Sequence, residues 1–192
     1  DRATEGEIFY NSGGFTIATH IGVGAWSAGS SLSTGRTHLS GSGTQTAAFA
    51  AGGLKPAVAN ETEEYNGSGW AAGGNLNTAR SILAAAGSQT AGLAFGGLAT
   101  TIRNESEEYD GSSWTEGDNL NTARRALGGA GTQTAGLAFG GSNPTTTEKN
   151  ETETYDGSSW TEVANLNDAR DFVGGLGTQT AALCISGESP SL

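Results

Sequence analysis

A segment of eleven residues occurs four times in this chain of 192 residues with little change. Successive copies are separated by 44, 44 and 46 residues, and they begin at Gly43, Gly87, Gly131 and Gly177. In every copy an arginine stands 17 residues before the last glycine of the segment. Self-similarity at such a period indicates a repeat architecture, in which each repeat forms one supersecondary unit. The chain therefore has to fold as a few similar units packed on one another.

An acidic and aromatic segment follows the first three copies. Its sequences are EEYNGSGW at 63–70, EEYDGSSW at 107–114 and ETYDGSSW at 153–160. Asn-Gly or Asp-Gly between a tyrosine and a tryptophan predicts a tight β-hairpin, because its turn needs positive φ angles. Each repeat is thus expected to form four short strands. In the repeat that begins at Arg124 we predict them at 126–130, 135–139, 151–155 and 159–162.

The order of an arginine, two apolar strands ending in Gly-Gly, a tyrosine and a tryptophan resembles the kelch repeat. The resemblance covers nearly the whole chain, and it is carried by the four arginines together with Gly52-Gly53, Gly96-Gly97, Gly140-Gly141, Tyr65, Tyr109, Tyr155, Trp70, Trp114 and Trp160. It implies an all-β fold, a four-bladed kelch-type β-propeller. The fourth repeat departs from the pattern, because Ser186-Gly187 replaces the glycine pair.

The hairpin that the fourth repeat lacks has a counterpart near residue 1. Ile8–Phe15 aligns with the hairpin segment, with Tyr10 at the tyrosine position and Phe15 at the tryptophan position. We therefore expect strands from both termini to close the last blade, which removes exposed sheet edges. Exchange of these strands between two chains would use the same residues. The expected single domain spans 1–192, with blades at 36–79, 80–123, 124–169 and 170–192 joined with 1–35.

Charge and hydropathy exclude two classes of partner. The 20 acidic residues outnumber the 9 basic ones, which gives a formal charge of −11 and disfavours nucleic acids and anionic lipid surfaces. No apolar run approaches the roughly 18 to 20 residues that span a bilayer, so membrane insertion is not expected.

The residues that usually carry catalysis are sparse. Cys184 is the one cysteine and lies in an apolar run, which predicts a buried structural thiol. Only His20 and His38 could assist it, and nothing ties either histidine to the cysteine. No segment matches an established calcium loop. We therefore expect no catalytic residue, no metal site and no cofactor, although a carboxylate pair assembled only in three dimensions stays possible.

The repeated arginines are the first candidates for ligand binding. They are Arg36, Arg80, Arg124 and Arg170. The kelch resemblance implies that arginines just before the first strand of a blade bind acidic ligands at a rim or a central bowl. The alternative is a structural role, in which each arginine pairs with a carboxylate or with backbone carbonyls to hold neighbouring blades together.

The connections between the second and third strands differ from repeat to repeat. They span 54–61, 98–105 and 142–151, and they contain Lys55, Arg103 and Lys149. Loops on a rigid scaffold are where recognition usually resides. These three basic residues are therefore ligand-binding candidates, and drift in unconstrained surface connections is the alternative.

The repeats, rich in glycine and threonine and preceded by GEIFYNS, also resemble those of structural and appendage proteins of marine tailed phages. We expect a non-enzymatic binding, adhesion or display module, extracellular or on a virion, that binds a protein or a glycan through its loops. Two alternatives stay open. One is a purely architectural module that self-associates in a larger assembly, and the other is a secreted carbohydrate-active enzyme.

Overall fold

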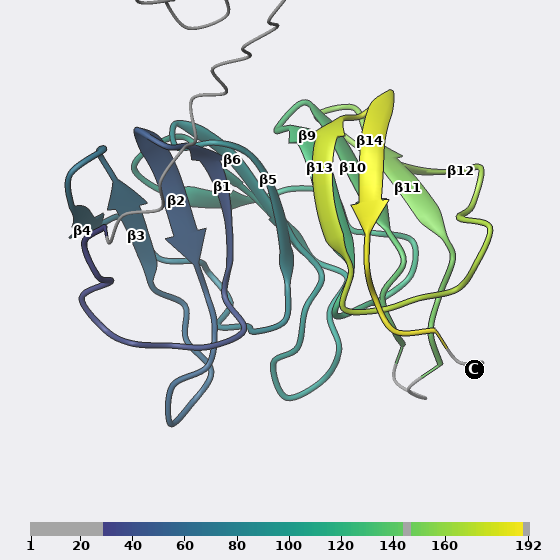
Figure 1. Cartoon of the computed structure of the whole chain (residues 1–192), viewed down its shortest axis with the longest axis horizontal. Helices are drawn as coiled ribbons and strands as arrows, with labels where there is room; N and C mark the ends of the chain where they lie inside the picture. Colours follow the sequence, from purple (N-terminus) through teal and green to yellow (C-terminus); the bar gives the residue numbers. More distant parts are fainter. Residues whose placement is uncertain (1–28, 144–146, 190–192) are drawn as a thin grey trace, which may run out of the picture.

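Short antiparallel strands make up the regular structure of the chain, as a computed structural model shows (Figure 1). The structure describes residues 29–143 and 147–189. Within these ranges there are fourteen strands and no helix. The described part of the chain is therefore all-β.

Three of the sheets have four strands each, and their strands follow one another in sequence order. The first sheet contains β1 (Ser40–Thr44), β2 (Ala47–Ala51), β3 (Thr62–Tyr65) and β4 (Trp70–Ala72). The second contains β5 (Ala84–Ser88), β6 (Ala91–Phe95), β7 (Ser106–Tyr109) and β8 (Trp114–Glu116). The third contains β9 (Gly128–Thr132), β10 (Ala135–Phe139), β11 (Thr152–Tyr155) and β12 (Trp160–Val163). The fourth sheet has two described strands, β13 (Gly174–Thr178) and β14 (Ala181–Ile185).

The prediction of four strands per repeat is confirmed in the first three sheets. In the third sheet β10 has the predicted bounds, and the other strands shift by one or two residues. The largest shift has a clear cause. Ala126 has a φ of 55°, in the left-handed region, so an extended strand cannot include it. β9 consequently begins at Gly128.

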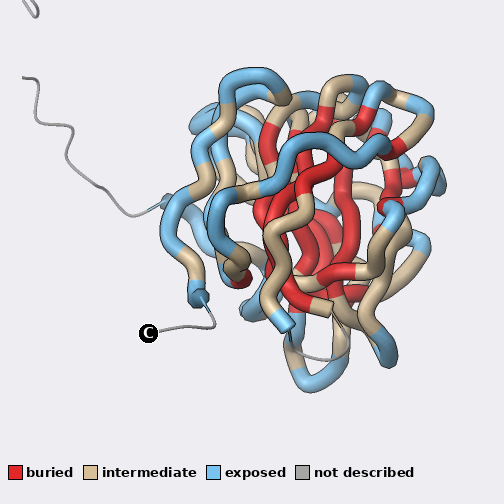
Figure 2. Tube along the Cα trace, turned by 90° about the vertical axis from the view of Figure 1, so that its right-hand side faces the viewer, coloured by how far each residue is buried: buried red, intermediate tan, exposed pale blue. Residues whose placement is uncertain are grey.

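The inner strands of adjacent sheets, β1, β5, β9 and β13, lie side by side (Figure 1). Their close approach requires small residues. A Cβ on Gly129 would lie 2.8 Å from the Ala85 carbonyl oxygen, and one on Gly175 would lie 2.3 Å from the Gly129 carbonyl oxygen. Figure 2 shows the buried residues gathered along the middle of the molecule. The glycines of β9 and β13 therefore set the distance between sheets.

Aromatic side chains of the outer hairpins fill the space between neighbouring sheets. The Trp114 ring packs edge-on against Phe49 of the first sheet, with 5.6 Å between the ring centroids. The Trp114 indole also donates a hydrogen bond to Thr62 Oγ1 at 3.0 Å. Tyr109 is fully buried and donates to Glu64. Burial, with the nearby Glu64 carboxylate, raises the pKa of Tyr109 to about 12. The hairpin of the second sheet is thereby fixed to the first sheet, and Tyr155 and Trp160 make the equivalent bonds from the third sheet to Glu108 and Ser106 of the second.

The β7–β8 turn is held by its aspartate. The Asp110 carboxylate accepts hydrogen bonds from the backbone N–H groups of Ser112 and Ser113, both at 2.8 Å. These bonds lower the pKa of Asp110 to about 2. Asp156 makes the same bonds in the third sheet, and its pKa is also lowered. In the first sheet the uncharged Asn66 side chain accepts the equivalent two bonds from the N–H groups of Ser68 and Gly69.

The fourth sheet differs from the others in what it leaves exposed. Leu183 and Ile185 on β14 are 60% and 46% exposed, whereas the equivalent Leu93 and Phe95 on β6 are fully buried. In the other sheets the second strand pairs with a third strand. Ile8–Phe15, the segment predicted to supply that strand, lies outside the described residues.

We expect the aspartate turns to make stability sensitive to acid. Because the Asp110 pKa is lowered on folding, its contribution is present above pH 4, the ordinary range of an aspartate, and is lost as the pH falls through about 2. NMR titration of the Asp110 carboxyl carbon should give a midpoint near 2. A midpoint near 3.9 would show that the turn does not form these bonds. The D110N/D156N variant, which copies the uncharged turn of Asn66, should lose less stability between pH 4 and pH 2 than the parent chain.

Candidate functional site

Two positions immediately after each repeated arginine vary, although the residues around them are nearly constant. The pairs are Thr37-His38, Ser81-Ile82, Arg125-Ala126 and Asp171-Phe172. The first member of each pair forms an isolated bridge to the start of the loop that follows the second strand. The second member lies two residues before the first residue of the inner strand. Both positions therefore lie at the end of the sheets where the variable loops begin.

The second member of each pair has a left-handed backbone. The φ angles of His38, Ile82, Ala126 and Phe172 are 54°, 54°, 55° and 50°. This conformation costs a residue other than glycine about 1–2 kcal/mol, and it is most unusual for the β-branched Ile82. Main-chain hydrogen bonds between sheets link three of these residues, since Ile82 N–H donates to the His38 carbonyl at 2.8 Å and Ala126 N–H donates to the Ile82 carbonyl at 2.9 Å. Strain that is maintained in this way is frequent at functional sites.

These four residues surround a pocket of about 220 Å³, which we term the axial pocket. The residues that complete its lining are apolar: Leu39, Leu83, Leu127 and Val173. Phe172 is 51% exposed there. A second hollow of about 340 Å³ lies further along the four inner strands and is lined mostly by glycine and alanine. Each of the four sheets thus contributes one variable side chain to the axial pocket.

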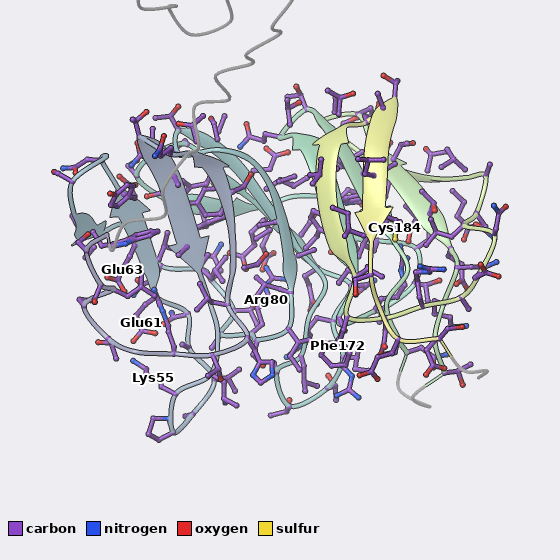
Figure 3. The ribbon with its side chains drawn as sticks, in the orientation of Figure 1. Lys55, Glu61, Glu63, Arg80, Phe172 and Cys184 are labelled. Carbon is purple, nitrogen blue, oxygen red and sulfur yellow. The ribbon has the colours of Figure 1, made fainter. Side chains whose placement is uncertain are left out.

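The variable loops lie at the same end as the axial pocket. Figure 3 shows Lys55 and Phe172 toward the same end of the molecule, away from Cys184. In the first two loops a short hairpin forms, with bridges from Leu54 to Val58 and from Leu98 to Ile102. Side chains that change between repeats are therefore concentrated on one face, which we term the variable face: residues 37–38, 81–82, 125–126 and 171–172 and the loops 54–61, 98–105 and 142–151.

The repeated arginines of the second and third sheets are buried and form ion pairs with glutamates of the same sheet. Arg80 is fully buried and forms an ion pair with Glu107 of β7. Its other nitrogen donates to the Glu105 carbonyl at 2.7 Å. Glu107 in turn accepts a bond of 2.7 Å from the Asn77 N–H, on the connection that enters the second sheet. Burial lowers the pKa of Arg80, and the Glu107 charge opposes that effect.

The same arrangement recurs in the neighbouring sheets. Arg124 is fully buried and pairs with Glu153 at 2.7 Å, and Arg36 pairs with Glu63 at 2.9 Å. Arg170 differs, because its partner at 3.5 Å is the exposed Asp168. In the first three sheets these guanidinium groups hold the segment before the inner strand to the third strand of the same sheet, so each ion pair lies within one sheet and does not join neighbouring sheets.

The basic residues of the loops are paired as well. Lys55 pairs with Glu61, Arg103 with Glu105 at 3.1 Å, and Lys149 with Glu151 at 3.4 Å. Each pair lies within one loop and is partly exposed. The Lys55 ammonium is the main cause of the lowered pKa of Glu61. The structure places these residues on the variable face, and it gives each of them a carboxylate partner.

Sequence reasoning missed the two variable positions after each arginine. The signal was present in the aligned repeats, which read RTHL, RSIL, RRAL and RDFV at 36–39, 80–83, 124–127 and 170–173. The variation is confined to two residues between nearly constant flanks, the arginine before them and a leucine or valine after them. The left-handed backbone gave no sequence signal, since none of the four residues is a glycine.

Neither a protein-family model nor a curated protein matches the chain. Over the described ranges no helix is long and apolar enough to cross a membrane. No group of three or more histidine, cysteine, aspartate or glutamate side chains placed to hold a metal ion occurs in the same ranges. Cys184 is a partly buried free thiol, and burial raises its pKa.

Removal of one member of a buried ion pair tests the role of the repeated arginines. The Glu107→Gln change keeps the shape of the side chain but leaves the Arg80 charge buried and uncompensated. We expect the free energy of unfolding to fall by about 3–5 kcal/mol, measured by urea denaturation. Arg103→Gln is the matched control, because it breaks a partly exposed pair and should cost at most about 1 kcal/mol. Equal losses in both variants would contradict a structural role specific to the buried pairs.

Proposed function

We propose that this chain is a non-enzymatic binding or display module built on a four-bladed kelch-type β-propeller, and that it binds a protein or a glycan through its variable face. The observation that carries the proposal is a contrast in sequence variation between one end of the sheets and the rest of the fold. The arginines, aromatic residues and turns that join the sheets repeat almost unchanged, whereas the axial pocket and the loops at one end change from sheet to sheet. Variation on a rigid scaffold is typical of recognition surfaces.

The axial pocket fits such a role in shape and in chemistry. Its lining is apolar, with His38 as its titratable side chain. Concave apolar sites with a few polar groups are the usual form of a small-ligand site. The module would act outside the cell or on a virion, where adhesion and display take place.

The fourth sheet has two described strands, β13 and β14, whereas a complete blade of the proposed propeller has four. We assign its third and fourth strands to the segment that includes Ile8–Phe15, from the same chain. The exposed Leu183 and Ile185 support this assignment, because their equivalents on β6 are covered. In the second sheet Ala94 pairs with Glu107. By the alignment of the repeats, the assignment would pair Cys184 with Ile8.

That register can be tested by a disulfide. In an Ile8→Cys variant, mild oxidation should join residue 8 to Cys184 within one chain, because directly opposite residues of paired strands bring their Cβ atoms to about 4.5–5.5 Å. Non-reducing electrophoresis and thiol counting provide the measurement. Phe9→Cys is the matched control, since its side chain points to the other face of the strand and should cross-link poorly. A dimer would indicate strand exchange and favour the architectural alternative, and no link in either variant would refute the register.

Replacement of the loop tips tests the binding function. A screen of glycans and candidate proteins first identifies a ligand. The tips 55–57 and 99–101 are then replaced by Gly-Ser-Gly, which should weaken binding at least about tenfold, or 1.4 kcal/mol. Ser112→Gly/Ser113→Gly is the control, because this turn lies at the opposite end of the second sheet. Unchanged binding after the loop replacement, or no ligand in the screen, would contradict the proposal.

A further inference from the structure

One basic residue of the variable face differs from all the others in its surroundings. The described residues include eight lysines and arginines, and seven of them form ion pairs with a carboxylate. Arg125 is the eighth, and within 29–143 and 147–189 its side chain has neither an ion pair nor a hydrogen bond. Its Nε is buried without a partner, as are those of Arg36, Arg80, Arg103 and Arg124, so the missing ion pair is what distinguishes Arg125. In a chain with 20 acidic residues, an arginine left unpaired is a specific feature of this position.

Arg125 borders a pocket of about 380 Å³ between the second and third sheets. The loop of the second sheet supplies the other walls: Leu98, Thr100, Thr101 and Ile102. Leu98 and Ile102 are partly buried, and the two threonines are exposed at the tip of the loop. The pocket therefore combines one guanidinium group, two adjacent hydroxyl groups and an apolar wall. Its volume is in the range of small-ligand sites.

The main chain on both sides of this pocket is fixed. The backbone of Arg125 exchanges hydrogen bonds of 3.0 and 2.8 Å with Ser142, and that of Leu98 exchanges bonds of 2.7 and 2.9 Å with Ser81. The bridge from Leu98 to Ile102 closes the loop that carries the threonines. A ligand would thus meet walls that need little ordering, which reduces the entropic cost of binding.

The equivalent positions in the other sheets do not repeat this chemistry. They hold Thr37, Ser81 and Asp171, so the guanidinium group is a property of the third sheet alone among the four. A residue needed for folding would recur at each equivalent place, as Arg36, Arg80 and Arg124 do. Arg125 is therefore explained better by a ligand than by the fold.

We propose that this pocket binds an acidic sugar, with the guanidinium of Arg125 on the anionic group, the hydroxyls of Thr100 and Thr101 on ring hydroxyls, and the ring against Leu98 and Ile102. An arginine fork matches a carboxylate or a sulfate with two parallel hydrogen bonds. The net charge of −11 opposes a polyanion, so the favoured ligand is an otherwise neutral glycan with isolated acidic units. This inference rests on the proposed binding function and names the ligand class for one part of the variable face.

Titration of the chain with simple sugars, followed by NMR of the backbone amides, tests the site. The probes are methyl glucuronide, glucose 6-sulfate and the neutral methyl glucoside. We expect an anionic sugar to shift the amide signals of Thr100, Thr101 and Ile102, and the neutral sugar to bind at least about tenfold more weakly, because it lacks the charge-assisted hydrogen bonds. Comparison of the first two probes shows whether the anionic group is a carboxylate or a sulfate.

Variants connect the signal to Arg125. Arg125→Ser gives the third sheet the residue that the second sheet has at Ser81, so folding should be preserved, and thermal unfolding checks this. Anionic sugars should bind this variant at least about tenfold more weakly. Thr115→Glu is the control for net charge, because it makes the same change on an exposed position of β8 and should leave binding unaltered.

Three results would overturn the inference. They are unchanged anionic sugar binding in Arg125→Ser, equal binding of the neutral sugar, and binding of an acidic peptide at Arg125 without any binding of the sugars. None of these results contradicts the proposed function if replacement of the loop tips still weakens binding of another ligand. The proposed function itself fails only if that replacement leaves ligand binding unchanged, so the two failures can be distinguished.

Discussion

A buried ion pair between an arginine and a glutamate positions each of the first three sheets. In the second sheet Glu107 contacts both Arg80 and the backbone of Asn77, so one carboxylate joins the incoming connection to the third strand. Such a pair adds little net stability, because both charges lose their hydration. It does specify geometry, since any other arrangement would leave a buried charge uncompensated. In these three sheets the contact fixes the start of the inner strand and, with it, that part of the variable face.

The sequence predicts much of the fold because its local signals agree with one another. Asp-Gly turns with a tyrosine and a tryptophan give the outer hairpins, and the glycine-rich inner strands indicate close packing. The strand bounds were less accurate where a residue other than glycine adopts a left-handed backbone, as Ala126 does. That conformation depends on a main-chain bond to Ile82 in another sheet, which no local pattern encodes.

The site was harder to predict than the fold, and the reason is electrostatic. Arg80 and Glu107 are 27 residues apart, so their pairing becomes visible only when β5 and β7 are placed in one sheet. The loop pairs are a different case. Arg103 and Glu105 are two residues apart, and this proximity already indicated that the basic group is partly neutralised. The seven candidates predicted from repetition or from loop position all have a carboxylate partner, whereas Arg125, which is neither repeated nor in a loop, has none among the described residues.

The left-handed residues around the axial pocket have an evolutionary consequence. The bonds that link Ile82 to its neighbours use main-chain N–H and C=O groups, so they do not depend on which side chain is present. The presence of histidine, isoleucine, alanine and phenylalanine at the four places demonstrates this tolerance. A duplicated unit of this kind can change its contribution one copy at a time while the joints between copies persist. The number of possible side-chain combinations around the pocket therefore multiplies with each added copy, while the scaffold stays the same.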